Sequence, residues 1–90
     1  MTVKFFATYR EITKCAQMNI APPKDVLALL IELCEKFPAF YEKLLTQDRQ
    51  ALGPDAIVLV NGRHIVHLNG VATTLSEQNV VAVFPLVAGG

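Results

Sequence analysis

The last residues of the chain carry its most distinctive candidate reactive group. The sequence ends Val87-Ala88-Gly89-Gly90, directly after the apolar run Val80–Phe84. A terminal α-carboxyl group has a pKa of roughly 3.3–3.7, so at neutral pH Gly90 presents a carboxylate that can attack the α-phosphate of ATP within a partner enzyme. The product would be an acyl-adenylate, open to attack by sulfur or nitrogen. Neither glycine has a Cβ, which lets the tail pass close to a partner's backbone. The sequence therefore predicts that Gly90, assisted by Gly89, is the reactive end.

The other residues that could take part in catalysis or metal binding are less well arranged. Cys15 and Cys34 form no Cys-x-x-Cys or Cys/His cluster, which argues against a disulfide framework or a zinc site. His64 and His67 are three positions apart in an expected strand, so their side chains point to opposite faces. We therefore expect no metal site and no acid–base enzyme, with all catalytic side chains supplied by partners.

Composition limits the remaining possibilities. Ninety residues make a single domain over residues 1–90, and eight basic residues balance eight acidic ones. Without a Lys/Arg stripe, the chain lacks the attraction expected of a nucleic-acid or membrane binder. The longest purely apolar run, Val26–Ile31, falls short of the roughly 18 residues that span a bilayer. The start, Met1–Lys4, resembles no secretion signal, and we expect a cytoplasmic protein with protein partners.

The first half of the chain predicts a hairpin followed by a helix. Loose alternation indicates a strand over Val3–Thr8, and Gln17–Ile20 offers a return strand through a loop at Arg10–Cys15. Beyond Pro22-Pro23, apolar residues recur at helical spacings of three and four. These residues are Val26, Leu29, Leu30, Leu33, Cys34 and Phe37. Asp25 suits the start of this helix and Pro38 ends it, with a second short helix over Ala39–Leu45.

The second half predicts three further strands. Ala56–Val60 is apolar without alternation, which is typical of a strand buried on both faces, and Asn61-Gly62 is a strong hairpin turn. Arg63–His67 would be its short partner, Asn69-Gly70 a second turn, and Val80–Phe84 the last strand. We expect Pro85 to end regular pairing and a flexible tail to begin at about residue 85. This order predicts an α+β fold of the β-grasp, or ubiquitin-like, kind, in which one main helix packs across a mixed sheet.

Charge is sparse in the same half of the chain. After Gln50 the only charged residues are Asp55, Arg63 and Glu77, so an exposed apolar patch there would mark a protein interface. Ile57, Leu59, Val81 and Val83 are expected in the core. Phe84 and Leu86, on either side of Pro85, are the better interface candidates. Arg63 either solvates the turn or pairs with an acidic partner.

Three blocks of the sequence resemble a known family. They are Val3-Lys4-Phe5-Phe6-Ala7 with Arg10-Glu11, then Val58 to Arg63, then Val80 to Pro85 with the Ala88-Gly89-Gly90 end. Together they are similar to the MoaD family, the small sulfur-carrying subunit of molybdopterin synthase. Leu86 stands where that family often has a second proline, and Glu77-Gln78-Asn79 replaces a more usual glycine and aspartate turn.

The resemblance implies a function and a set of partners. Gly90 would be adenylated by a MoeB-like enzyme that consumes ATP, and then thiocarboxylated with sulfur from a persulfide protein. The tail, with Phe84, Pro85, Leu86, Val87, Ala88 and Arg63 as partner contacts, would then enter a MoaE-like large subunit. There the sulfur would pass to a pterin precursor of the molybdenum or tungsten cofactor. The chain itself would be a non-catalytic subunit with no bound cofactor.

Two alternatives stay open. One is a different carrier on the same fold, either of the ThiS type of thiamine synthesis or a ubiquitin-like carrier for tRNA thiolation or protein conjugation. ThiS-type chains are usually shorter and lack the long segment from Pro38 to Asp55. The other is a β-grasp binding module with no reaction at its end.

Overall fold

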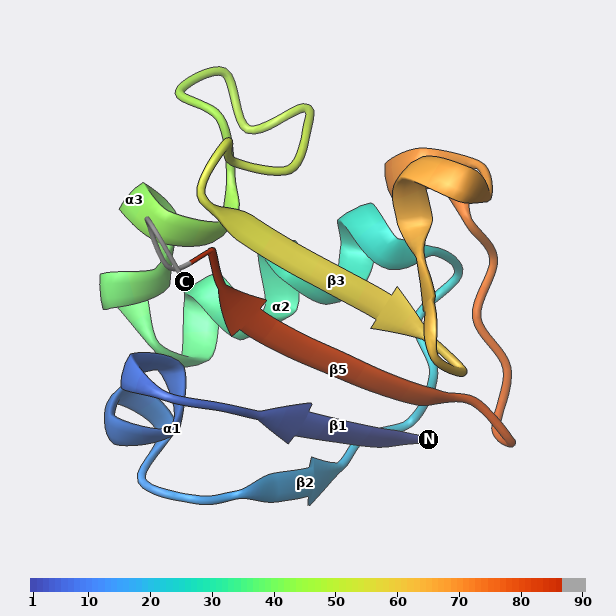
Figure 1. The fold of residues 1–90 in the computed structure, drawn as a ribbon, viewed down its shortest axis with the longest axis horizontal. Helices are drawn as coiled ribbons and strands as arrows, with labels where there is room; N and C mark the ends of the chain where they lie inside the picture. Colours follow the sequence, from blue (N-terminus) through green and yellow to red (C-terminus); the bar gives the residue numbers. More distant parts are fainter. Residues whose placement is uncertain (87–90) are drawn as a thin grey trace.

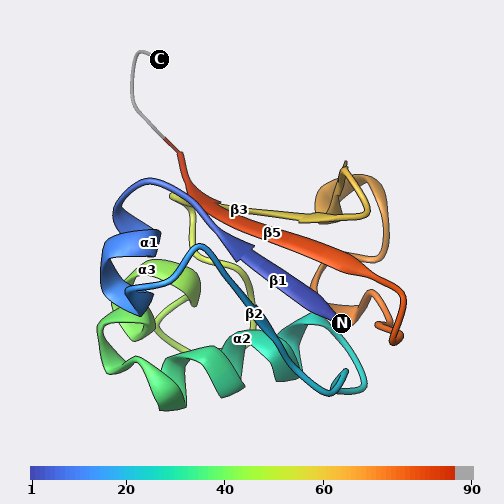
Figure 2. The same ribbon diagram turned by 90° about the horizontal axis from the view of Figure 1, so that it is seen from below.

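The computed structural model describes residues 1–86, which form a five-stranded mixed sheet with helices packed against one face (Figures 1 and 2). The strand order is β2-β1-β5-β3-β4; β1 and β5 run parallel, and the other neighbours run antiparallel. The strands are β1 (Thr2–Phe5), β2 (Gln17–Asn19), β3 (Ala56–Val60), β4 (Arg63–His64) and β5 (Val80–Pro85). This arrangement confirms the predicted α+β, β-grasp fold.

The main helix, α2 (Val26–Lys36), crosses one face of the sheet as predicted. Asp25 caps its N-terminus, because the carboxylate accepts a hydrogen bond from the Ala28 N–H at 2.9 Å. The helix stops before Pro38, which lacks the N–H needed to continue the helical hydrogen bonds. All predicted inward residues except Phe37 are fully buried: Val26, Leu29, Leu30, Leu33 and Cys34. This helix therefore packs against the sheet and encloses the hydrophobic core from that side.

The short helix predicted over residues 39–45 is also present. It begins as a 3-10 turn, η1 (Pro38–Phe40), and continues as α3 (Tyr41–Leu44). The fully buried Phe40 ring contacts the rings of Phe5, Tyr9 and Phe37 at centroid distances of 6.1, 5.3 and 5.9 Å. This aromatic cluster joins α3 to β1 and to the segment that follows β1.

The segment after β1 differs from the sequence prediction, because it forms a helix where a hairpin loop was expected. β1 ends at Phe5, and α1 (Thr8–Thr13) occupies most of the predicted connection. Tyr9 and Thr13, four residues apart on one helical face, are buried. Ala7 and Lys14 at its ends adopt φ values of 53° and 61°, which are unusual for residues other than glycine. Tertiary burial of Tyr9 thus outweighs the weak local preference for a helix.

β3 corrects a second prediction, because only one of its faces is buried. Ala56, Val58 and Val60 are buried toward the helices, whereas Ile57 and Leu59 are half-buried on the other face. No described helix covers that face, so a strand of uniformly apolar sequence still alternates in exposure (Figure 2). The prediction of a core position is confirmed for Val81 and Val83 and is wrong for Ile57 and Leu59.

The turn after β3 forms as predicted, but the strand that follows is shorter. Asn61 and Gly62 have φ values of 52° and 82°, as a tight hairpin turn requires. Asn61 also ties this turn to β5, because its Oδ1 accepts from the Val80 N–H at 2.8 Å and its N–H donates to the Val80 carbonyl at 2.8 Å. β4 covers only Arg63–His64. Residues Ile65–His67 form a 3-10 turn, η2, whose Val66 N–H donates to His64 Nδ1 at 3.2 Å.

The last strand runs one residue further than predicted. Pro85 lies opposite Ala56 in register, and the Leu86 N–H donates to the Asp55 carbonyl at 2.8 Å. Pro85 has no N–H to give, yet the pairing continues because the next residue supplies one. Before β5, the second predicted turn, Asn69-Gly70, leads into the 3-10 helix η3 (Gly70–Ala72). None of the helices within residues 1–86 has the length and apolar character needed to cross a membrane.

Candidate partner-docking site

Four apolar side chains gather on the face of the sheet that the helices leave open. They are Phe6, Leu59, Ala82 and Phe84, which we call the open-face patch. Strand register brings them together: Leu59 lies opposite Ala82 and Ile57 opposite Phe84, while Phe6 follows the last residue of β1. Because side chains alternate along a strand, the burial of Val81 and Val83 beneath the sheet places Ala82 and Phe84 above it.

The patch is a shallow hollow with a fixed aromatic pair. The Phe6 and Phe84 rings meet edge to face, with centroids 6.0 Å apart and an interplanar angle of 88°. Phe6 remains 42 % exposed although it is a large apolar residue, and the hollow between these side chains measures about 310 Å³. Apolar surface gathered in this way is typical of a protein-binding site. An edge-to-face pair of this kind favours the observed orientation of the two rings by about 0.5–1.5 kcal/mol.

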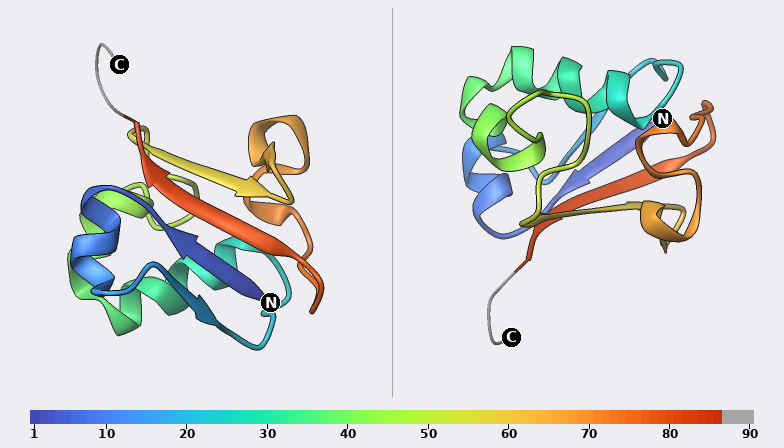
Figure 3. Two further views of the ribbon diagram at one scale, coloured as in Figure 1. Left: turned by 60° about the horizontal axis from the view of Figure 1, so that its bottom comes forward. Right: turned by 90° about the horizontal axis from the view of Figure 1, so that it is seen from above.

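The chain leaves the sheet beside this patch. β5 ends at the corner where β3 begins (Figure 3), and Leu86, 56 % exposed, follows Pro85 with its backbone held by Asp55. Three of the predicted contacts therefore lie together where the chain leaves the sheet: Phe84, Pro85 and Leu86. The remaining predicted tail residues, Val87, Ala88, Gly89 and Gly90, lie outside the described residues.

Arg63, the other predicted contact, lies at the far end of the sheet. It pairs with Val60, which in turn faces Val81, whereas the exit lies at Pro85. Four residues of strand at about 3.3 Å each separate the two positions, or roughly 13 Å along β5. The structure therefore does not bring Arg63 together with Phe84 and Leu86.

A different cation borders the patch. Lys4 is exposed on β1 directly opposite Ala82, in the same row as Leu59. Sequence reasoning missed Lys4, Phe6 and Leu59 as surface neighbours. A signal for them was present in the first strand, where Val3 and Phe5 alternate with Lys4 and Phe6. Because a single main helix covers only one face of the sheet, the second set lies on the uncovered face.

The cysteines and histidines do not form a site in the described part of the chain. Burial raises the pKa of the Cys34 thiol to about 11, so this fully buried side chain stays protonated at neutral pH and packs as an apolar group. Cys15 is half-buried at the end of α1. Within residues 1–86 no group of three or more His, Cys, Asp or Glu side chains is close enough to hold a metal.

A β-grasp sheet with one crossing helix and an open apolar face beside its C-terminal exit is the architecture of a ubiquitin-like carrier protein. The ThiS family model matches residues 3–90, and the chain belongs to this family of ubiquitin-like sulfur carriers. Such small carriers generally act without catalytic side chains of their own.

The individual relatives point to more than one role within this class. The chain is 39 % identical over 93 aligned positions to small archaeal modifier protein 3 of Haloferax volcanii, covering 100 % of this chain and 98 % of the relative. The solution structure of small archaeal modifier protein 1 from Methanosarcina acetivorans superposes with a TM-score of 0.86 at 28 % identity, covering 99 % and 94 % of the two chains. A putative molybdopterin converting factor, subunit 1, from Pyrococcus furiosus gives a TM-score of 0.77 at 27 % identity, covering 96 % and 95 %.

Proposed function

We propose that the protein carries sulfur on its C-terminal glycine, Gly90, after activation by a MoeB-like adenylating enzyme. The observation that supports this most is the open-face patch directly beside the exit of the tail at Leu86. A carrier needs a surface that a partner recognises and a tether that reaches the partner's reaction centre. The patch supplies the surface, and the four residues after Leu86 supply the tether.

The proposed chemistry needs no side chain of this protein. A Gly90 carboxylate oxygen attacks the α-phosphate of ATP, pyrophosphate leaves, and an acyl-adenylate forms. The terminal sulfur of a persulfide on a donor protein then attacks the acyl carbon, and AMP leaves. A second thiol attacks the donor cysteine's sulfur in the resulting acyl disulfide, which forms a new disulfide with the donor and releases Gly90 as a thiocarboxylate. ATP is consumed by the activating partner, and the carrier holds no cofactor.

Geometry limits where the partner's reaction centre lies. A fully extended residue spans at most 3.3–3.6 Å, so four residues reach about 14 Å beyond Leu86. The activating site must therefore lie within that distance of the surface that docks on the exit. Tethering of this kind raises the effective concentration of the sulfur in the partner's pocket.

For the destination of the sulfur, we propose molybdopterin synthesis, with this protein as the small subunit beside a MoaE-like large subunit. Support comes from the resemblance of its sequence blocks to the MoaD family and from the similarity to the putative molybdopterin converting factor subunit of Pyrococcus furiosus. The large subunit would supply the side chains that bind the pterin precursor, and its surface would cover the open-face patch.

A second candidate is protein modification, which the 39 % identity to a small archaeal modifier protein favours. Here the same adenylate would be passed to the amine of a target lysine, giving an amide bond and releasing AMP. Both candidates require Gly90, so the shared step is tested first and the destination second.

Tail variants test the shared step. Deletion of Gly90, one added residue, or Gly89→Val should abolish sulfur loading by a MoeB-like enzyme with ATP and a persulfide donor. Thermal unfolding should hardly change, because the buried residues of the core cluster lie between Val3 and Val83. A tail-extended variant that still loads without being trimmed would contradict the proposal. Loaded protein mixed with a MoaE-like subunit and pterin precursor should lose its sulfur, whereas a ladder of lysine conjugates in cells would favour modification.

A further inference from the structure

The face of the sheet that carries the open-face patch has an uneven distribution of charge. Strand register and alternation identify the residues of the five strands whose side chains point to this face. They are Thr2, Lys4, Gln17, Asn19, Ile57, Leu59, His64, Val80, Ala82 and Phe84. None of them is acidic, and Lys4 is the one lysine or arginine among them.

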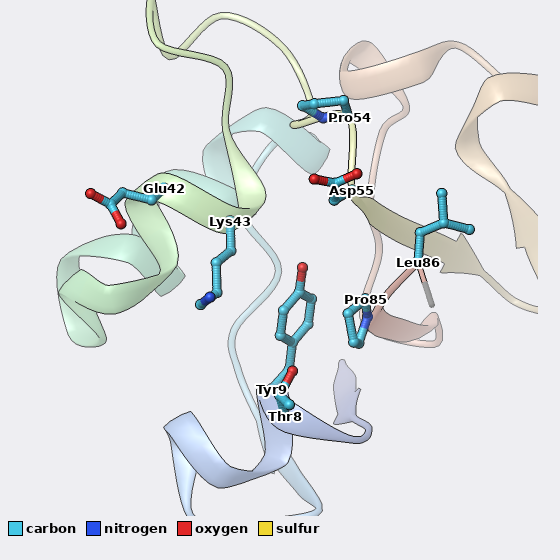
Figure 4. A pocket seen from close by; sticks show the side chains of 8 residues that line it. All are labelled: Thr8, Tyr9, Glu42, Lys43, Pro54, Asp55, Pro85 and Leu86. Atoms are coloured by element: carbon cyan, nitrogen blue, oxygen red, sulfur yellow. The ribbon is translucent and has the colours of Figure 1, made fainter. Parts of the chain in front are cut away.

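The acidic side chains lie elsewhere, although eight acidic and eight basic residues balance over the chain. No residue of the five described strands is acidic: the helices, the cap of α2 and the connections hold Glu11, Asp25, Glu32, Glu35, Glu42, Asp48, Asp55 and Glu77. The helices pack against the opposite face of the sheet (Figure 2). Asp55 directly precedes β3, but it borders a hollow with Tyr9 and Lys43 on the helix side of the tail exit (Figure 4). The open face thus presents a cation without a strand carboxylate to neutralise it.

Lys4 lies close enough to the open-face patch to be covered when a partner covers the patch. It is exposed on β1 and pairs with Ala82, which lines the hollow of about 310 Å³. Only one strand spacing, about 4.8 Å, separates the two backbones. The residue paired with Lys4 on its other side is Gln17, which carries no charge. A protein surface that fills the hollow therefore also removes water from the Lys4 ammonium, and because burying an unpaired charge is costly, the occupant has to supply an anion there.

The opposite border of the patch carries no comparable charge. His64 of β4 pairs with Leu59, and its Nδ1 accepts a hydrogen bond from the Val66 N–H at 3.2 Å. A ring nitrogen that accepts a hydrogen bond carries no proton, so this imidazole is neutral in the observed arrangement. Three strand spacings, roughly 14 Å, separate His64 from Lys4. The charge of the open face is therefore confined to its β1 side, which determines where an anion of the partner has to lie.

We propose that the partner of the open-face patch docks with an acidic surface, which places an apolar side chain in the hollow and an aspartate or glutamate carboxylate against Lys4. The apolar contact supplies most of the affinity, and the ion pair fixes the orientation and accelerates association. A second copy of this chain docking face to face does not fit, because its open face brings another Lys4 and no strand carboxylate. The inference rests on the proposed function in that it takes the partner to be the enzyme that activates Gly90.

The test measures the affinity and association rate of the full-length protein for a purified MoeB-like activating enzyme from the same genome. The decisive variant is Lys4→Met, which keeps a long apolar side chain and removes the charge. We expect it to weaken binding by about three- to tenfold, and Lys4→Glu by about thirtyfold or more because it opposes like charges. Lys36→Met and Lys36→Glu make the same changes at the exposed end of α2, on the helix side, and should stay within about twofold.

A purely apolar docking surface would give a different result. In that case Lys4→Met would enlarge the apolar surface and bind as tightly as the wild type or more tightly, which would overturn the inference. All four variants should melt near the wild-type temperature, since Lys4 and Lys36 are exposed, so their affinities can be compared directly. Raising NaCl from about 0.05 to 0.5 M should slow association of the wild type more than that of Lys4→Met, and equal salt dependence would contradict the ion pair.

Charge reversal identifies the residue of the partner. Each aspartate and glutamate on the docking face of the activating enzyme is changed to lysine and combined with Lys4→Glu. One of these changes should restore about tenfold or more of the lost affinity, and the absence of any rescue would contradict the proposal. Sedimentation equilibrium of the protein alone covers the other occupant, because dimers that Phe84→Ala abolishes would make a second copy the partner of the patch.

Sulfur loading is recorded on the same samples and keeps this inference apart from the carrier function. Lys4→Glu should raise the concentration of activating enzyme needed for half-maximal loading, whereas the Lys36 variants should not. Wild-type protein that binds with the expected dependence on Lys4 but never gains sulfur would refute the carrier function and leave the docking inference standing. Normal loading together with an affinity that ignores Lys4 would do the reverse.

Discussion

Phe84→Ala separates docking from folding at the open-face patch. Phe84 is half-buried and lies outside the core cluster, and among residues 1–86 its one aromatic contact is with Phe6. Truncating a fully buried phenylalanine costs about 3–5 kcal/mol. Here only part of that burial and one ring pair, about 0.5–1.5 kcal/mol, are lost, so we expect the free energy of unfolding to fall by about 1–2 kcal/mol. Partner affinity should fall by about 2 kcal/mol or more, which is roughly thirtyfold.

The assay is chemical denaturation and partner binding measured on the same preparations. Phe40→Ala is the matched control, because this ring has no exposed surface and contacts three other rings. It should lose about 3–5 kcal/mol of stability. The affinity of its remaining folded fraction should be unchanged. If Phe84→Ala instead lost stability like Phe40→Ala and kept its affinity, Phe84 would be a core residue and the docking surface would lie elsewhere.

Three further outcomes follow from the fold. Asp25→Ala removes the N-cap of α2 and should lower the free energy of unfolding by about 1 kcal/mol in urea titrations, whereas Asp25→Asn should retain most of it. Gly53→Ala places a Cβ 2.9 Å from the Lys43 carbonyl oxygen, so the melting temperature should drop, and an unchanged value would show that this loop yields freely. Cys34, with its pKa raised to about 11, should resist iodoacetamide at pH 8 and react only as the pH approaches 11 or the protein unfolds; rapid labelling of the folded protein at pH 8 would contradict its burial.

The elements with strong periodic signals could be predicted from the sequence. Spacings of three and four defined α2, Asp25 and Pro38 marked its two ends, and Asn61-Gly62 marked the hairpin after β3. The element α1 could not be predicted in this way. Its six residues are too few to show a period, and Lys14 ends it in a left-handed conformation where glycine is usual. The helix depends on burial of Tyr9 against Phe40, a contact distant in sequence.

The site was predicted only in part for a related reason. Phe84 and Leu86 were identified because they flank Pro85 after the last strand. Leu59 was assigned to the core because its strand is apolar throughout, and only the sheet's uncovered face shows that it is a surface residue.

The central claim is most directly tested by locating the sulfur after loading. The protein is incubated with a MoeB-like enzyme, ATP and a persulfide donor, and the intact mass and C-terminal peptide are then measured by mass spectrometry. We expect one oxygen to be replaced by one sulfur, on the peptide that ends at Gly90 and only when ATP is present. Sulfur found instead on Cys15 or Cys34, or incorporation without ATP, would show that the tail is not the carrier.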